Sequence, residues 1–163
     1  MKSMRLKLIL CLSLLTLLTG CRALNTPPSV ADIQQSFENN HHYLFEVVDY
    51  LTTSGYENVY ILNLDGTMQA DLSRISVPDD IEAQVLGLLK SSACTQICKI
   101  GETVSFLCWT GPQDIGCGIV YSADTPYVQF MTQCVPLSID GWYYYVSDYN
   151  TWRNEGGTPA GEG

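Results

Sequence analysis

Basic residues are scarce in this sequence, and their scarcity excludes a large class of function. The 163 residues include 8 Lys and Arg against 17 Asp and Glu, and three of the basic residues lie within the first seven positions. Residues 21–163 therefore carry a formal net charge of −12. Because a surface of that sign repels phosphate groups, we expect no nucleic-acid partner and no attachment to anionic lipid headgroups through a basic face.

Histidines and catalytic motifs are equally sparse. His41 and His42 are the only histidines, and adjacent side chains on a helix point in different directions, so the two rings do not easily share one ion. His42 and Glu46 share a helical face, but the sequence supplies no third ligand beside them. No Gly-x-Ser-x-Gly, His-Glu-x-x-His or phosphate-binding glycine loop is present. The sequence thus indicates no metal and no cofactor, and it favours a protein that is not an enzyme.

The chain also lacks an apolar run long enough to cross a membrane. The run at Leu8–Leu18 has 11 residues, whereas a transmembrane helix needs about 20. It follows Lys2, Arg5 and Lys7, and a basic start before a short apolar run is typical of a secretory signal peptide.

The run ends in Leu18-Thr19-Gly20-Cys21, which resembles the lipobox of bacterial lipoproteins. The resemblance covers residues 1–21. It implies that a peptidase removes residues 1–20 by cutting between Gly20 and Cys21. It also implies that the Cys21 sulfur carries a diacylglycerol; in some members of the family the new amine carries a further chain, such as palmitate. The mature protein would then be lipid-anchored on the extracytoplasmic face of the cell membrane. The alternative is an ordinary signal peptide with a cysteine there by chance.

The mature chain divides into three parts. Residues 21–28 read as a lipidated tether that Pro27 and Pro28 keep extended, and residues 154–163 as a disordered tail rich in glycine. The length between them predicts one domain over residues 29–153. This domain resembles the small lipoproteins common in Gram-positive bacteria, but no motif makes that likeness specific.

Two helices are expected. In the first, Ser29 and Asp32 form a capping box and Gly55 supplies a left-handed end, while Asn39-Asn40 are poor helix formers and could divide it. The second is expected to start near Ser76, and its apolar stripe is Ile81, Val85, Leu88 and Leu89.

Alternation and turn signals predict strands over the rest of the domain. The first strand is expected over residues 56–64. A turn at Asp65-Gly66 follows it, and a short second strand then runs back through residue 72. Later strands are expected at about 95–100, 103–109, 115–122, 127–134 and 142–147. The predicted fold class is α+β, a mainly antiparallel sheet with two helices packed on one face.

Five cysteines remain in the predicted domain: Cys94, Cys98, Cys108, Cys117 and Cys134. The favoured disulfide joins Cys108 to Cys117 across a hairpin, and a weaker second pair joins Cys134 to Cys94 or Cys98. Buried free thiols are the other structural reading. Zinc or redox chemistry is the functional alternative, although Cys94-x3-Cys98 is not the spacing of thiol oxidoreductases.

The most aromatic stretch is Trp142-Tyr143-Tyr144-Tyr145. In a strand, Trp142 and Tyr144 face one way and the other two rings face the opposite way. Trp142 and Tyr144 are the candidate aromatic binding face, suited to stacking on sugars or anchoring a protein. Packing of these rings in the core is the alternative.

Three functional hypotheses follow. The first is a non-catalytic, membrane-anchored binding protein that engages a protein or glycan partner through an aromatic sheet face or the 123–141 connection. The second is an extracytoplasmic enzyme or thiol redox protein built on Cys98, Cys134 and His42. The third is an inhibitor or immunity-type lipoprotein.

Overall fold

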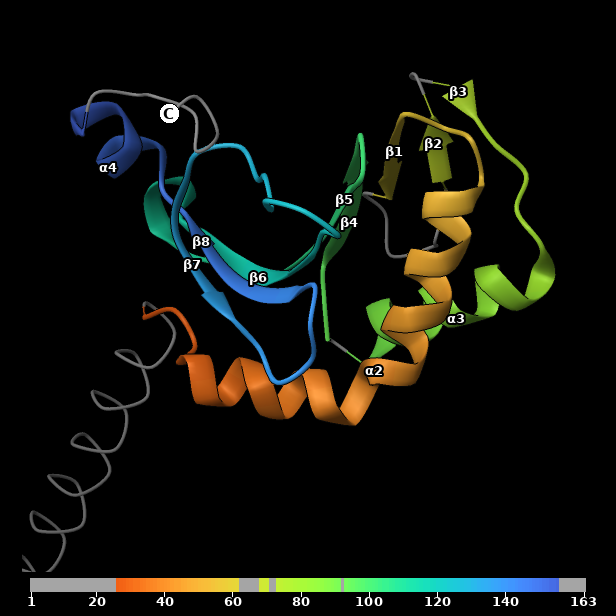
Figure 1. The fold of residues 1–163 in the computed structure, drawn as a ribbon, viewed down its shortest axis with the longest axis horizontal. Coiled ribbons are helices and arrows are strands. Elements are labelled where there is room, and N and C mark those ends of the chain that lie inside the picture. Colours follow the sequence, from red (N-terminus) through yellow and green to blue (C-terminus); the bar gives the residue numbers. More distant parts are fainter. Residues whose placement is uncertain (1–25, 62–67, 71–72, 92, 156–163) are drawn as a thin grey trace, which may run out of the picture.

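The computed structural model describes residues 26–61, 68–70, 73–91 and 93–155. The expected signal peptide, the lipobox and most of the tether fall outside these ranges, as does the tail from residue 156. The described part is an eight-stranded antiparallel sheet with two main helices packed on one face (Figure 1). The predicted α+β class is confirmed. None of the described helices is long and apolar enough to cross a membrane.

The first helix, α2, covers Val30–Thr53, and both of its predicted ends are confirmed. The Ser29 hydroxyl accepts a hydrogen bond from the Asp32 N–H, and the Asp32 carboxylate accepts one from the Ser29 N–H. Gly55 follows the helix with φ +76°, a conformation that costs glycine little. Asn39-Asn40 do not divide the helix, which remains continuous but changes direction partway along (Figure 1).

The second helix, α3, covers Asp79–Lys90, so the predicted start near Ser76 is wrong by three residues. Pro78 occupies the N-cap in an extended conformation, and a residue before proline is disfavoured in the helical region. The helix therefore begins only after the proline. Its predicted stripe of Ile81, Val85, Leu88 and Leu89 is buried as expected.

The strands form one sheet of order β3-β2-β1-β4-β5-β6-β8-β7 in which every pairing is antiparallel. Their bounds are β1 Asn58–Ile61, β2 Met68–Ala70, β3 Ser73–Arg74, β4 Gln96–Ile100, β5 Thr103–Thr110, β6 Gly116–Tyr121, β7 Met131–Pro136 and β8 Trp142–Ser147. The first two strands pair as predicted, but the Asp65-Gly66 turn lies outside the described residues.

Two segments near the C-terminal end differ from the expectation. The strand predicted at 127–134 starts at Met131, and residues 122–130 form an irregular connection instead. A short helix, α4, covers Tyr149–Asn154 and was not predicted. Asp148 caps it by accepting hydrogen bonds from the N–H groups of Asn150 and Thr151.

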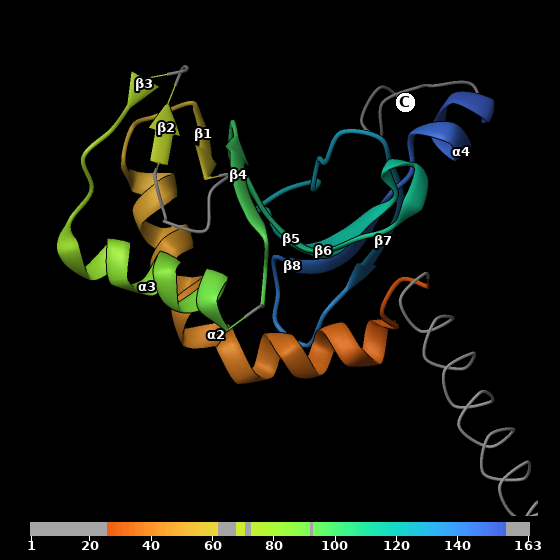
Figure 2. The same cartoon turned by 180° about the vertical axis from the view of Figure 1, so that it is seen from behind.

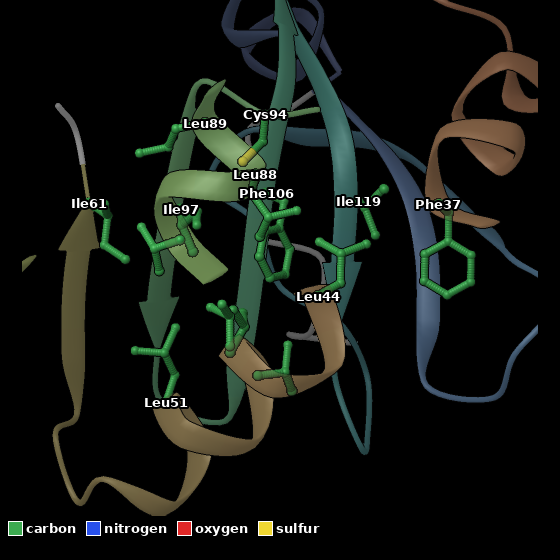
Figure 3. Packing of buried hydrophobic residues seen from close by; sticks show 14 of the residues in the cluster. Phe37, Leu44, Leu51, Ile61, Leu88, Leu89, Cys94, Ile97, Phe106 and Ile119 are labelled. Atoms are coloured by element: carbon green, nitrogen blue, oxygen red, sulfur yellow. The ribbon is translucent and has the colours of Figure 1, made fainter. Parts of the chain in front are cut away.

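The core lies between the two helices and one face of the sheet. Figure 3 shows side chains from α2, α3 and the central strands meeting there. The contributors it labels are Phe37, Leu44, Leu51, Ile61, Leu88, Leu89, Cys94, Ile97, Phe106 and Ile119. Because side chains alternate along a strand, the residues between these core positions point to the other face of the sheet. That second face is where a ligand site has room to form.

Candidate functional site

The sheet face away from the core carries a hollow of about 220 Å³. Its wall includes part of the irregular connection between β6 and β7, which lies on the side of the sheet away from α2 (Figures 1 and 2). The lining residues are Tyr60, Gln96, Cys98, Ile100, Thr103, Ser105, Leu107, Tyr127, Val128, Gln129, Tyr145 and Ser147.

The floor is set by the strand register. Cys98 on β4 lies between Tyr60 on β1 and Ser105 on β5 in one cross-strand row. In a neighbouring row, Gln96 on β4 pairs with Leu107 on β5. All of these side chains project to the same face because residues opposite each other in adjacent strands share a face.

Glycines on β6 keep the neighbouring part of this face free of side chains. Gly116 pairs with Ser147, and Gly118 lies between Leu107 and Tyr145. A Cβ at Gly116 would come within 2.9 Å of the Leu107 Cδ1 atom and 3.0 Å of the Ser147 hydroxyl. Because Gly116 and Gly118 have no side chains, space remains for the groups that line the hollow.

One wall comes from Tyr127–Gln129, and its end is held in an unusual backbone conformation. Phe130 has φ +59°, which costs a non-glycine residue roughly 1–2 kcal/mol. The Phe130 carbonyl accepts a hydrogen bond of 2.9 Å from the Asp148 N–H. Its ring packs edge-on against Tyr149 and Trp152 of α4, at centroid distances of 4.9 and 5.1 Å. The short helix thus fixes the connection where it passes the hollow.

The polar groups of the lining are amides and hydroxyls. Gln96 and Gln129 each present both donors and an acceptor. The Ser105 hydroxyl donates to the Cys98 carbonyl at 3.3 Å, and the Ser147 hydroxyl donates to the Gly116 carbonyl at 3.4 Å. Each serine oxygen can still accept a hydrogen bond from a ligand.

Burial favours the uncharged form of two groups in the hollow, the Cys98 thiol and the Tyr145 phenol. Burial raises the pKa of the Cys98 thiol to about 11. Burial also raises the pKa of the Tyr145 phenol, and the neighbouring thiols add to the effect. Among the residues that the structure describes, no carboxylate, amine, guanidinium or imidazole lines the hollow. The site therefore offers neutral hydrogen-bonding groups and ring surfaces, and its thiol is not activated as a nucleophile.

The prediction of a binding face at Trp142 and Tyr144 is wrong. Their side chains are 1% and 3% exposed and belong to the core. The Trp142 ring packs against Phe37 of α2 at 5.1 Å and against Phe106 of β5 at 6.2 Å. Trp142 and Tyr144 share one face of the sheet, as the alternation predicted, but the helices cover this pair of rings. Tyr145, of the opposite pair, lines the hollow instead.

The predicted Cys108–Cys117 disulfide is also wrong. All five cysteines of the domain are free, and a β-bulge shifts the register between Leu107 and Trp109, so that Trp109 pairs with Cys117. Cys108 is the extra residue of the bulge. Burial raises the pKa of the Cys94 thiol to about 12 and that of Cys117 to about 11. The alternative of buried free thiols describes Cys94 and Cys117, whereas the other three free thiols are partly exposed.

The residues of the enzyme hypothesis do not assemble into one site. His42 is exposed on α2, in the helix layer, whereas Cys98 lies in the hollow on the other face of the sheet. Cys134 on β7 pairs with Tyr145 and is not part of the lining. Within the described ranges, no three His, Cys, Asp or Glu side chains come together as metal ligands.

Sequence reasoning singled out Cys98 and the 123–141 connection, which contains Tyr127–Gln129, but missed the other lining residues. The signal that could have found them is the alternation along β4 and β5. Gln96 and Cys98 alternate there with the buried Ile97, and Ser105 separates the buried Val104 and Phe106. Polar residues at every second position mark a second, uncovered face. Their meeting with Tyr127–Gln129 depends on the tertiary fold.

No protein-family model, curated protein or solved structure matches this chain.

Proposed function

We propose that this protein is a lipid-anchored, non-catalytic binding protein of the cell surface, and that it holds a small ligand in the hollow on the sheet face away from α2 and α3. The observation that carries the binding role is the composition of the lining. Twelve described side chains supply amides, hydroxyls, rings and aliphatic groups. That combination orients and holds a ligand, and this described part of the lining contains no group poised to transfer a proton or to attack a substrate.

The rigidity of the site supports the same role. The floor belongs to paired strands of a single sheet, and the wall at Tyr127–Gln129 is adjacent to the Phe130 backbone that α4 holds in place. A site whose shape is set before binding loses little conformational entropy when the ligand enters. Recognition therefore needs no rearrangement of the fold.

The anchor rests on the lipobox-like residues Leu18-Thr19-Gly20-Cys21. Acyl chains on Cys21 would hold the protein stably, because each buried methylene contributes about 0.8 kcal/mol. The seven residues from Arg22 to Pro28 could span at most roughly 25 Å. Such a tether keeps the domain close to the membrane and free to turn its hollow toward ligands at the surface.

The binding role is tested by filling the hollow. In the variant Ser105→Leu, an isobutyl group replaces a hydroxymethyl on the floor. We expect this variant to lose the small molecules that the unaltered protein retains from a cell-surface extract. Mass spectrometry of the retained fraction measures the loss.

The matched control is Ser76→Leu, which makes the same exchange at an exposed position that does not line the hollow. It should retain the same molecules as the unaltered protein. Circular dichroism verifies that both variants are folded. Equal retention by the two variants, or no retention by the unaltered protein, would contradict a binding site in the hollow.

A further inference from the structure

We infer that the ligand of the hollow is a neutral saccharide, bound through a single sugar ring. This inference rests on the proposed binding role of the hollow and names the chemical class of its ligand. Four properties of the lining lead to it: its charge, its hydrogen-bonding groups, its aromatic surface and its size.

Within the described ranges of the chain, the lining carries no charged side chain. A carboxylate, phosphate or ammonium group that entered the hollow would lose water and gain no counter-ion, which is costly. The hollow therefore selects against charged ligands, although the chain as a whole is strongly acidic.

The hydrogen-bonding groups suit a ligand rich in hydroxyls. The amides of Gln96 and Gln129 and the hydroxyls of Thr103 and Ser105 can each donate and accept. A sugar hydroxyl also donates and accepts at one oxygen. A ligand with only acceptors would leave part of this lining unpaired, and unpaired buried polar groups reduce affinity.

The apolar groups suit the C–H face of a sugar ring. Tyr127 is 39% exposed where the connection meets the hollow, so part of its ring remains available for stacking. Tyr60 and the aliphatic Leu107 and Val128 supply further apolar surface. Rings of this kind offer a large contact area at little cost in conformational entropy.

Size and position argue against a peptide. The volume of about 220 Å³ is below the roughly 300–1,000 Å³ of pockets that hold drug-sized ligands, which limits the occupant to one ring. The strand residues of the lining come from β1, β4, β5 and β8, each of which is paired on both sides. A peptide therefore cannot add to the sheet here as a new strand.

The test measures binding of neutral methyl glycosides to the full-length protein by saturation-transfer NMR and titration calorimetry. The panel contains methyl glucoside, galactoside, mannoside and N-acetylglucosaminide, and the corresponding uronic acids and amino sugars. We expect at least one neutral glycoside to bind, and its charged counterpart to bind about tenfold more weakly.

Matched variants locate the binding. Gln96→Ala and Gln129→Ala should each weaken it by about tenfold, the order expected for one lost hydrogen bond. Gln35→Ala, at an exposed position of α2, should not change it. Tyr127→Ala should weaken binding, whereas Phe45→Ala, which removes a ring of similar exposure on α2 outside the hollow, should leave it intact.

Failure of this inference and failure of the binding role give different results. If no neutral glycoside binds, or if binding is insensitive to both glutamine substitutions, the saccharide assignment is overturned. If the Ser105→Leu variant still abolishes retention of some other molecule, such as a neutral peptide, the hollow remains a binding site with a different ligand. If nothing is retained by the unaltered protein, both proposals fail.

Discussion

Gly118 shows how strongly one residue constrains this sheet. It lies on β6 opposite Leu107, where the bulge at Cys108 disturbs the pairing with β5. A Cβ at Gly118 would come within 1.9 Å of the Phe106 carbonyl oxygen and 3.0 Å of the Cys108 nitrogen. These are backbone atoms, which cannot turn away as a flexible side chain would. Only glycine therefore allows the two strands to approach this closely.

We predict that Gly118→Ala destabilises the protein by more than the roughly 1–3 kcal/mol typical of overpacking, because the added methyl meets the backbone itself. Urea unfolding followed by circular dichroism measures the change. The comparison variant is Gly101→Ala, which has φ +56° but open space around its Cβ position and should cost only about 1–2 kcal/mol. Equal losses for the two variants would show that the strands can separate to admit the methyl.

Helix ends illustrate what a single element determines by itself. The capping box at the start of α2 uses residues three apart in sequence, so it forms whenever the helix forms. The hydrogen bond from the Ser29 hydroxyl, with a second from its N–H, lowers the pKa of the Asp32 carboxyl below its ordinary value. Asp148 is in a similar position at the start of α4, where bonds from Thr151 lower its pKa.

The lowered pKa of Asp32 gives the helix a definite pH dependence. A carboxyl whose pKa is lower in the folded state contributes stability that is complete above its unfolded pKa, about 4, and is lost as pH falls through the folded value. Ser29→Ala removes the largest cause of the shift. We predict that the Asp32 pKa then rises toward its ordinary value, and that the variant loses more stability at pH 6 than at pH 3.

Carboxyl-detected NMR titration and thermal unfolding at the two pH values measure these effects. Asp148 provides an internal control, because its hydrogen bonds come from α4 and its titration should be the same in the Ser29→Ala protein. An unchanged Asp32 titration in that variant would contradict the role assigned to the Ser29 hydroxyl.

At the scale of the whole molecule, the two faces of the sheet have different tasks. One face packs against α2 and α3 and supplies the core, whereas the other carries the hollow. Because the two faces are separate, the hollow can carry polar groups without exposing the core. Tyr144 also fixes the start of the domain, since its hydroxyl donates to the Pro28 carbonyl at 3.4 Å. The proposed tether would join the domain at this point.

The proposed anchor predicts how the whole protein distributes between membrane and water. Protein purified from its natural membrane should begin at Cys21 and carry a diacylglyceryl group on that sulfur, as measured by intact-protein mass spectrometry. Cys21→Ala should abolish the modification and shift the protein from the detergent phase to the aqueous phase. Cys134→Ala changes a cysteine within the domain and should leave the distribution unaltered. An unmodified sulfur or an intact leader in the natural protein would refute the anchor.

Local patterns in the sequence were sufficient for much of the fold. The capping box at Ser29, the left-handed Gly55 and the buried stripe of α3 all depend on neighbours within a few residues. Strand β8 matches its predicted range, because its alternation is unbroken. Where a local rule was overlooked, as with the effect of Pro78 on the start of α3, the prediction failed by about one helical turn.

The site required the tertiary structure. Alternation shows that Trp142 and Tyr144 share a face, but it does not say which face the helices cover; the packing of Phe37 on Trp142 decides that. Likewise, a bulge in β5 moved Cys108 out of register with Cys117, although hairpin spacing favoured their pairing. The hollow joins β1 and β4 to the segment Tyr127–Gln129 and to β8. Side-chain period is a local property of a strand, whereas the choice of covered face and the meeting of distant segments depend on how all the elements pack together.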